Sequence, residues 1–377
     1  MMDDRSAGGV WLAGLLLVKR KERKEMRYPE FLKEKGTIGF VAPSFGCSIE
    51  PYRTAFENAR KRWQAKGYRL HLGPNCFASD GVGISSSPEN CGRELQDFYL
   101  KEDNDCLISC GGGELMCEIL EYLDFDEISA AAPKWYMGYS DNTNMTFLLT
   151  TLCDTASIYG PCAAAFGMEP PHPAIEDAMD VLTGKKRMLR SYGMWEKEGK
   201  RDEEHPLMPY HCTEPLALRN YLPGAEDGKG HWFLADEAVM EGRLLGGCMD
   251  CLVNLLGTKF DQVKKFLAKY QEDGFIWFLE SCDLNVFGIR RAMWQMEMAG
   301  WFEYVKGFLI GRPYCHGQEM MGLDQYEAVL STAMRHKVPV IMDADLGHLP
   351  PMMPLVSGSY AKVKSTENKL EIEMVYR

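Results

Sequence analysis

Two residues of the types that activate a nucleophile stand at the ends of predicted strands in the second half of the chain. Glu280 directly follows the apolar run FIWFL, and His348 lies in the loop DLGHLPP after an apolar run that ends at Met342. Active-site side chains of α/β proteins gather at the carboxyl ends of strands. An acid that orients an imidazole base is two thirds of a nucleophile–His–acid triad. An exposed acid and a surface-loop histidine are the alternative readings of each residue taken alone.

The third member of such a triad requires a tight turn from a strand into a helix. The sequence SCGGGELMC, from Ser109 to Cys117, follows a predicted strand over residues 106–109. Its three glycines let the backbone approach a substrate, and N–H groups at a helix start can hold an oxyanion. The turn lacks the Lys-Ser/Thr ending of a phosphate loop. It is therefore a candidate nucleophile elbow, with simple close packing of the glycines as the alternative.

The remaining candidates indicate neither a metal nor a cofactor. Cys248 and Cys251 form one CxxC pair without a second, so we predict buried core cysteines and not a zinc site. No HExxH occurs, and no GxGxxG follows a strand. Trp195, Tyr210 and Trp232 are either an aromatic lid over a ligand or the packing of a long loop against its own domain.

The elements that must position these residues alternate between strand and helix. In the first half, strands are predicted at 37–42, 68–72, 106–109 and 134–138, with helices at 52–66, 88–100, 116–123 and after residue 143. This alternation implies a parallel α/β sheet. Residues 185–235 are polar and without clean periodicity, which is typical of a linker or lid. The predicted organisation is a tail at 1–25, an N-terminal α/β domain at 26–170, a linker or lid insertion at 171–240 and a C-terminal domain at 241–377.

Length and composition agree with a two-domain globular protein. A chain of 377 residues exceeds the size at which one core usually stops growing. The net charge of −12 argues against nucleic-acid binding, which needs clustered Lys and Arg. The odd number of cysteines, 13, indicates reduced thiols in the cytoplasm and not a disulfide framework.

The N-terminal tail carries an apolar run at residues 7–18, followed by a basic cluster. The run is shorter than the roughly 20 apolar residues of a membrane span, and the acidic start does not suit a signal peptide. We interpret residues 1–25 as an extension from an upstream start codon or a disordered tail, dispensable for folding, with a weak membrane-surface anchor as the alternative. No later apolar stretch is long enough to span a bilayer, so no stable membrane insertion is expected.

Several segments together resemble one family. They are GTIGFVAPS from Gly36, ISCGGGELMCEILEYLDFD from Ile108, MGYSDNT from Met137, YGP from Tyr159, EGRLLGGCMDCLVNLLGT from Glu241, WFLE ending at Glu280, and GHLPPMMPLVSG from Gly347. In this order, over most of residues 36–365, the chain resembles the serine LD-carboxypeptidases, which include murein tetrapeptide carboxypeptidases and microcin C immunity peptidases. The long segment at about 185–240 is more similar to the immunity branch.

The resemblance implies a fold and an activity. The fold would be an N-terminal parallel-sheet α/β domain with a nucleophile elbow, followed by a C-terminal β-rich α/β domain. Glu280 and His348 match the catalytic acid and base of metal-free serine hydrolases. Such enzymes cut an amide next to a free carboxylate, in the cytoplasm, commonly as homodimers. The implied ligand is a small murein peptide or a peptidyl-nucleotide-like molecule.

Two departures from the family pattern bear on activity. Counted back from Tyr122-Leu123-Asp124, the nucleophile serine falls on Met116, whose thioether cannot attack a carbonyl. Cys117 is a replacement candidate, because thiolates are strong nucleophiles. Gly112, Gly113 and Cys117 are the expected sources of oxyanion-holding N–H groups. The family's GGN pattern also changes to Gly-Gly-Cys at Cys248.

These departures leave two functions to weigh. The first is a carboxypeptidase-class hydrolase, favoured by Glu280 and His348. The second is a non-catalytic relative that binds such a ligand, favoured by Met116. A cytoplasmic α/β protein of another class is a third reading. We adopt the hydrolase as the working prediction, with catalytic activity itself left open.

Overall fold

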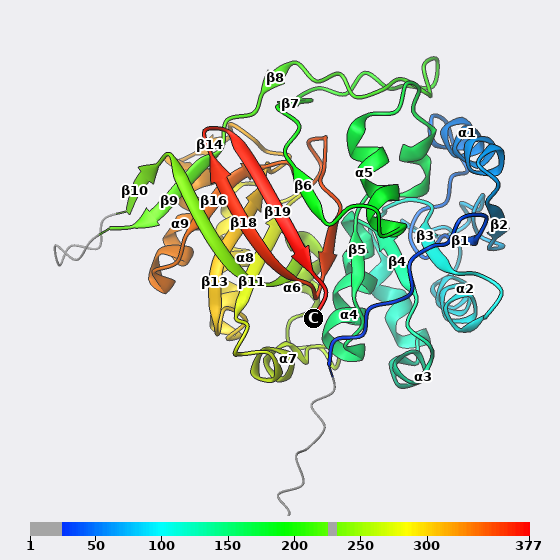
Figure 1. Ribbon diagram of the computed structural model, residues 1–377, viewed down its shortest axis with the longest axis horizontal. Helices are drawn as coiled ribbons and strands as arrows, with labels where there is room; N and C mark the ends of the chain where they lie inside the picture. The colour runs from blue at the N-terminus through cyan, green and yellow to red at the C-terminus, as the bar shows by residue number, and fades with distance from the viewer. Residues whose placement is uncertain (1–24, 225–231) are drawn as a thin grey trace, which may run out of the picture.

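Two β-sheets and their helices make up the molecule, which is represented by a computed structural model describing residues 25–224 and 232–377. In Figure 1 the first sheet lies on the right, with the N-terminal half of the chain, and the second lies on the left. Residues 1–24 of the predicted tail lie outside the described residues. Within the described ranges, no helix has the length and apolar character needed to cross a membrane.

The first sheet has six strands in the order β17-β5-β4-β3-β1-β2. Five are parallel, and β17 (Leu355–Ser357) returns from the far end of the chain to pair antiparallel with β5. The others are β1 (Thr37–Val41), β2 (Arg69–Leu72), β3 (Cys106–Ser109), β4 (Trp135–Gly138) and β5 (Ser157–Tyr159). The intervening helices are α1 (Tyr52–Ala65), α2 (Pro88–Leu100), α3 (Phe125–Ala130) and α4 (Thr143–Cys153), with short 3-10 turns η1 (Met116–Tyr122) and η2 (Ser140–Asn142). Every residue of β1, β3, β4 and β5 is buried, as expected for parallel strands covered on both faces.

The second sheet has nine strands in the order β10-β9-β16-β13-β12-β11-β18-β19-β6. Its centre is parallel: β11 (Glu237–Cys248), β12 (Phe275–Glu280), β13 (Val305–Gly311) and β16 (Val340–Ala344). Antiparallel strands extend both sides: β18 (Tyr360–Thr366), β19 (Lys369–Val375) and β6 (Met188–Arg190) on one, β9 (Arg219–Pro223) and β10 (Trp232–Ala235) on the other. The helices are α6 (Met249–Leu255), α7 (Val263–Lys269), α8 (Val286–Met298) and α9 (Gln325–Ala333).

The remaining elements are short. They are η3 (Ala163–Gly167), α5 (Pro173–Leu182), β7 (Met194–Trp195), β8 (Glu214–Pro215), β14 (Glu319–Met320), β15 (Leu323–Asp324) and η4 (Met334–His336).

The predicted fold class is confirmed: a parallel-sheet α/β half is followed by a β-rich half. Helix ends follow local chemistry. Ser87 caps α2 by accepting the Asn90 N–H, with Pro88 at the first turn, and Asp124 caps α3.

The described residues of the segment at 171–240, which are 171–224 and 232–240, form regular elements. The segment supplies α5, places β6 at one edge of the second sheet and β9 and β10 at the other, and adds the β7–β8 pair. Its strands have two to five residues, which is too short for an alternating pattern to appear in the sequence. Between these strands the chain runs over the top of the molecule in Figure 1.

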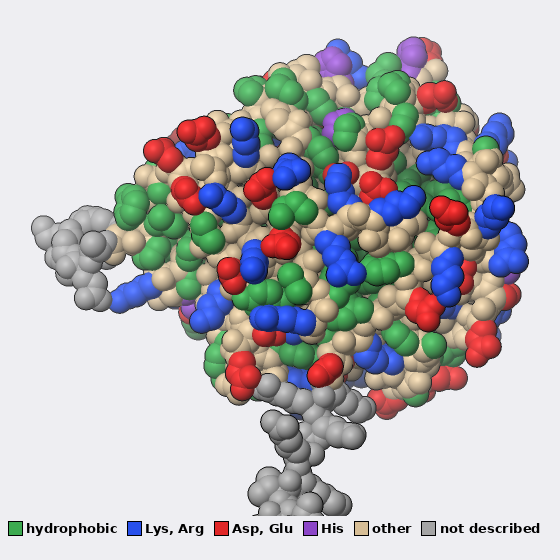
Figure 2. Space-filling model, viewed as in Figure 1, with side chains coloured by type: hydrophobic (Ala, Val, Ile, Leu, Met, Phe, Trp, Pro, Cys, Tyr) green, Lys and Arg blue, Asp and Glu red, His purple; other side chains and the backbone are tan. Residues whose placement is uncertain are grey.

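The face of the molecule shown in Figure 2 mixes acidic and basic side chains. Neither sign covers a broad continuous area on this face. Apolar side chains gather beside β9 and β10, where Phe233 and Leu234 are exposed.

Candidate active site

His348 lies between an acid and a hydroxyl. Its Nδ1 is 2.7 Å from Glu280 Oε2, and its Nε2 is 2.8 Å from Ser140 Oγ. The Tyr139 ring packs against the imidazole with centroids 5.2 Å apart. The expected contact between Glu280 and His348 is therefore present, and the hydroxyl on the other ring nitrogen is one that the sequence analysis did not select.

Glu280 is held rigidly at the end of β12. It is the last residue of that strand and is buried. The Tyr159 hydroxyl donates to Glu280 Oε1 and accepts the Ser140 N–H at 3.2 Å, so one phenol joins the acid to the serine backbone. Gly347 has φ +98°, and a Cβ there would lie 2.7 Å from Glu280 Oε2. Glycine at this position therefore allows the His348 loop to approach the carboxylate.

Ser140 occupies a sharp turn between β4 and α4. Its φ of +62° is unusual for a residue with a side chain. A Cβ on Gly138 would lie 2.7 Å from Asn142 Cγ, so the turn closes only over a glycine. Strand, Gly-Tyr-Ser-Asp-Asn and helix together form the strand–turn–helix geometry of a nucleophile elbow, in which local strain exposes the hydroxyl.

Met116, the residue expected at the nucleophile position, and the serine beside His348 have different surroundings. Met116 is fully buried in the hydrophobic core, and its N–H donates to Asp141 Oδ2 at 2.9 Å. The group within hydrogen-bond reach of His348 Nε2 is Ser140, one strand further along the chain. The glycine turn lies against that serine, because a Cβ on Gly112 would be 3.1 Å from Ser140 Cβ.

A signal for Ser140 was present in the sequence. The segment MGYSDNT places a serine two residues after a glycine that ends a strand, and a helix follows. That is the G-x-S-x-G pattern with Asn142 in the last place. Tyr159, in the segment YGP, was not selected either, because nothing local marks a buried phenol as a partner of Glu280.

The residues expected to hold an oxyanion near Ser140 differ in their contacts and in their free N–H groups. The N–H groups of Gly112 and Asp141 have no acceptor among the described residues, and Gly112 packs directly on Ser140. Gly113 instead fits against Ser44 and Gly83. Cys117 is half-buried, and burial raises the pKa of its thiol.

Electrostatics couples Glu280 to His348. Burial disfavours the imidazolium, but the Glu280 charge and hydrogen bond, with the nearby Cys282 thiol, outweigh it and raise the pKa of His348 well above its usual value. Burial likewise opposes ionisation of Glu280, yet His348 and the Tyr159 hydroxyl lower the pKa of that carboxyl. Both shifts favour an ion pair in the resting protein.

A cavity of about 410 Å³ opens onto His348. Four tyrosines line it, Tyr52, Tyr139, Tyr210 and Tyr314, together with Glu196 and Arg201. Tyr210 thus contributes to the cavity, as the aromatic-lid reading expects. Trp195 does not line it and instead packs on Arg312 and His316, and Trp232 lies in β10.

Arg312 anchors the loop that carries His348. Its buried guanidinium forms an ion pair with Asp345 at 2.8 Å and donates to the carbonyl oxygens of Asp343, Leu349 and Pro351. Asp345 also accepts the Tyr192 N–H at 2.8 Å. This network ties the loop to the segment before β7.

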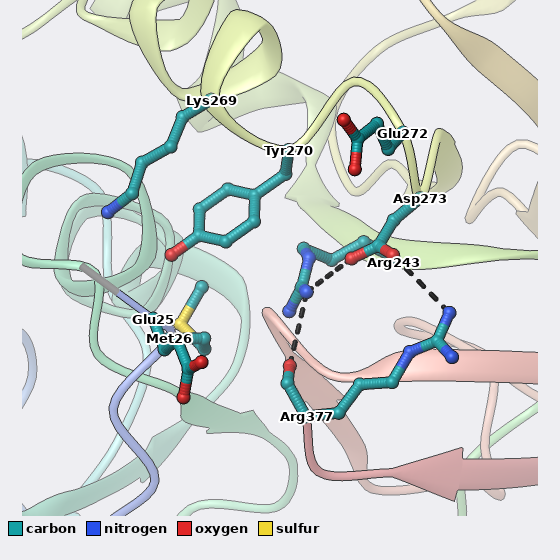
Figure 3. Close-up of a pocket in the computed structure, with 8 residues that line it drawn as sticks. All are labelled: Glu25, Met26, Arg243, Lys269, Tyr270, Glu272, Asp273 and Arg377. Atoms are coloured by element: carbon teal, nitrogen blue, oxygen red, sulfur yellow. Dashed lines mark hydrogen bonds and ion pairs between the residues drawn. The ribbon is translucent and has the colours of Figure 1, made fainter. Parts of the chain in front are cut away.

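A second cavity, of about 200 Å³, lies away from His348 beside α7 and the middle of β11 (Figure 3). Arg243, which is buried, binds Asp273 and the Arg377 carbonyl there, and Arg377 reaches back to Asp273. Lys269 pairs with Asp154. Arg243, Arg377 and Lys269 thus have acidic or carbonyl partners within the chain.

Comparison with known proteins shows the family to which this chain belongs. The model of the LD-carboxypeptidase N-terminal domain matches residues 38–160, and that of the LD-carboxypeptidase C-terminal domain matches residues 241–363. The chain belongs to the LD-carboxypeptidase family. The resemblance inferred from sequence segments is thereby confirmed.

Two curated relatives illustrate the range of this LD-carboxypeptidase family. The microcin C7 self-immunity protein MccF of Escherichia coli is 24% identical over 90% of this chain and 94% of its own length. The probable murein peptide carboxypeptidase of Bacillus subtilis is 23% identical over 92% of this chain and 94% of its own length.

Solved structures of LD-carboxypeptidase relatives share the fold. MccF in complex with adenosine monophosphate superposes with a TM-score of 0.74 at 22% identity, covering 92% of this chain and 98% of that one. An MccF-like protein from Bacillus anthracis gives the same TM-score and identity, covering 93% of this chain and all of that one.

Proposed function

We propose that this chain is an active serine-type peptidase of the LD-carboxypeptidase family in which Ser140 is the nucleophile. The observation that carries the proposal is the pair of hydrogen bonds on His348, 2.7 Å to Glu280 and 2.8 Å to Ser140. This order of acid, imidazole and hydroxyl is the arrangement that activates serine in unrelated hydrolases. Ser140 replaces Met116 as the nucleophile position of the sequence analysis.

Each residue then has one role. Neutral His348 accepts the Ser140 hydroxyl proton on Nε2 as Oγ attacks the amide carbonyl, and later donates it to the leaving amine. Glu280 accepts the Nδ1 proton in a hydrogen bond, holds the tautomer and stabilises the imidazolium. Water then hydrolyses the acyl-enzyme by the same route.

The oxyanion of the tetrahedral intermediate would lie at the start of the elbow helix. The Asp141 N–H follows the nucleophile directly, and the Gly112 N–H comes from the adjacent glycine turn. Donors fixed in a buried site are stronger than in water, because little reorganisation accompanies the reaction. Gly113 and Cys117 are left without a direct role in this proposal.

The substrate class follows from the cavity and the relatives. Four tyrosine rings suit a planar or extended ligand, and Arg201 is the one Lys or Arg among the lining residues, suited to a free carboxylate. We propose an amide next to a free carboxylate, in a murein peptide or a peptidyl-nucleotide-like molecule. The first matches the name of the Bacillus relative, and the second the ligands of MccF structures.

The alternative, a ligand-binding relative without activity, rested on Met116. The hydrogen bond between the Ser140 hydroxyl and His348 favours the active peptidase over this alternative.

The proposed setting is the cytoplasm, with the chain as a homodimer. All 13 cysteines are free thiols, which suits a reducing compartment. Exposed Phe233 and Leu234 on edge strand β10 are candidates for contact with a second copy. Light scattering coupled to gel filtration gives the oligomeric state.

The test compares native, Ser140→Ala and Cys117→Ala proteins. Release of the terminal D-amino acid from an LD-linked tetrapeptide, and of the amino acid from an aminoacyl-nucleotide amide, is measured. We expect native protein to cleave at least one substrate and Ser140→Ala to lose about four to six orders of magnitude in kcat. Cys117→Ala keeps its activity. Native protein inactive on both amides, or full activity in Ser140→Ala, would refute the proposal.

A further inference from the structure

One pair of residues singled out in the sequence has no part in the proposed hydrolysis: the cysteines of Cys248-Met249-Asp250-Cys251. Cys248 is the last residue of β11 and precedes α6, next to the strand that ends in Glu280. The parallel register of β11 and β12 sets Cys248 directly beside Glu280. Cys248 is buried, and its N–H donates to Thr143 Oγ1 at 3.0 Å, which fixes the backbone there.

This register brings three different ligand types together. Cys248 Sγ, a Glu280 carboxylate oxygen and a His348 ring nitrogen all lie within 4.8 Å of one another. Thiolate, imidazole and carboxylate are the ligands of protein zinc sites, with bonds of about 2.0–2.3 Å. Such bonds put neighbouring ligand atoms of a tetrahedron somewhat less than 4 Å apart. Small side-chain adjustments therefore suffice to gather the three atoms around one ion.

We propose that Cys248, Glu280 and His348 form an inhibitory site for a thiophilic divalent cation of the Zn²⁺ class. On binding, the Cys248 thiol proton and the proton on the liganding nitrogen of the His348 imidazolium leave to solvent, and no electron is transferred. The thiolate and the Glu280 carboxylate then neutralise the two positive charges of the ion, which removes the cost of an unpaired buried charge.

Solvent reaches this corner through a small cavity. The cavity, of about 200 Å³, is lined by Cys248 and Ser140 and also by Asp250 and Cys282. The cavity lets an ion approach Cys248, whereas Glu280 and His348 are not among its lining residues. We assign the fourth coordination position to water, because three protein ligands and one water are the arrangement of catalytic zinc sites.

The consequence for catalysis rests on the proposed function. The ion takes an imidazole nitrogen and the carboxylate that the hydrolysis uses, so metal binding and general-base catalysis exclude each other. Zinc at this site would hold the enzyme inactive, and a chelator would restore it.

Cys251 supplies a matched control. Its thiol points toward Ser140 O at 3.6 Å and Asp141 Oδ1 at 3.9 Å, and it also hydrogen-bonds the Cys248 thiol, a contact that a serine hydroxyl can keep. It is not one of the three clustered ligands. It is buried in the same Cys-x-x-Cys segment and lines the same cavity. Cys251→Ser therefore removes a thiol of the same surroundings without removing a ligand.

The experiment uses Co²⁺ as a spectroscopic probe and Zn²⁺ as competitor, on the full chain under a non-thiol reductant. We expect native protein to bind one Co²⁺ per chain with a thiolate-to-cobalt charge-transfer band that Zn²⁺ abolishes. Cys248→Ser should lose the band and bind Zn²⁺ about 100-fold more weakly or worse. Cys251→Ser should behave as native. Circular dichroism verifies folding, and Cys248→Ala replaces Cys248→Ser if that variant does not fold.

The outcomes of this experiment distinguish a failure of the proposed metal site from a failure of the proposed hydrolase function. Metal binding is read without turnover, and Ser140→Ala should show the same band. A band that persists in Cys248→Ser, a band lost in Cys251→Ser, or no band in native protein would overturn the site. If the band forms but Zn²⁺ leaves native turnover unchanged, the inhibitory role is overturned while the hydrolase proposal stands.

Discussion

At the scale of single residues, the site depends on how Glu280 controls the proton on His348. The buried carboxylate holds the pKa of the imidazole well above its usual value despite the opposing effect of burial. General-base catalysis requires the neutral imidazole, so kcat/KM should rise with pH through that raised pKa. The hydrogen bond from Tyr159 helps to keep Glu280 ionised at the lower end of this range.

Glu280→Gln tests this coupling. Without the carboxylate charge, only the nearby Cys282 thiol opposes the effect of burial, so the pKa of His348 should fall and the acidic limb of the kcat/KM profile should move to lower pH. The plateau should also fall by about four orders of magnitude, because the amide no longer selects the productive tautomer. The pH–rate profiles of both proteins provide the measurement. An unchanged limb would contradict the assignment of Glu280 as the orienting acid.

Two members of the proposed triad were recognisable from the sequence, and the third was passed over for a physical reason. Glu280 and His348 each follow an apolar run, which marks a strand end. Ser140 also follows a strand, but so does the glycine turn at residues 110–113, and both junctions lead into a helical turn. The Gly-Tyr-Ser-Asp-Asn pattern marks Ser140 as a candidate, but which of the two junctions faces His348 depends on how the second sheet packs on the first.

At the scale of elements, the loop before His348 depends on a glycine. Gly347 has φ +98°, and a Cβ would press on the Glu280 carboxylate at 2.7 Å. Gly317 has a similar φ of +80°, but a Cβ there meets nothing within 4 Å. Comparing alanine substitutions at Gly347 and Gly317 therefore distinguishes the effect of backbone strain from that of a steric clash with Glu280.

Gly347→Ala should therefore lose most activity, because the acid and the imidazole are pushed apart. Gly317→Ala should lose only about 1 kcal/mol of unfolding free energy and remain active. Urea titrations and kcat of both variants are the measurements. Equal kcat values in the two alanine variants would contradict a close contact between Gly347 and Glu280.

Long elements were predictable and short ones were not. Strands β1, β3 and β12 and helices α1 and α2 agree with the predicted ranges within about two residues, since each has a clear apolar period or a start signal. β17 has three residues and pairs with β5, which lies almost 200 positions earlier. Its place depends on tertiary contacts and leaves no periodic trace.

At the scale of the whole molecule, the two sheets are not built from two separate consecutive parts of the chain. β17 crosses from the C-terminal half into the first sheet, where Ser357 bonds Thr150 of α4 at 3.1 Å. The site takes Ser140 from the first sheet's elbow, Glu280 from the second sheet and His348 from the loop before β17. A hydrolase with this design functions only when both halves are folded together.

Unfolding should accordingly be one cooperative transition. Trp135 lies in the first sheet and Trp277 in the second, and both are buried. Trp135→Phe and Trp277→Phe variants each bias the tryptophan fluorescence toward the other half. We expect urea midpoints of the fluorescence and circular dichroism signals to coincide within each variant. Separated midpoints would mean that the halves unfold independently.

The most direct test of the central claim is the site of covalent labelling by a fluorophosphonate, which forms an Oγ–P bond with an activated serine and expels fluoride. Peptide mapping of the labelled native protein should locate one adduct on Ser140. Labelling should disappear in Ser140→Ala, fall strongly in His348→Ala and persist in Cys117→Ala. An adduct on any other residue, or none on native protein, would contradict Ser140 as the nucleophile.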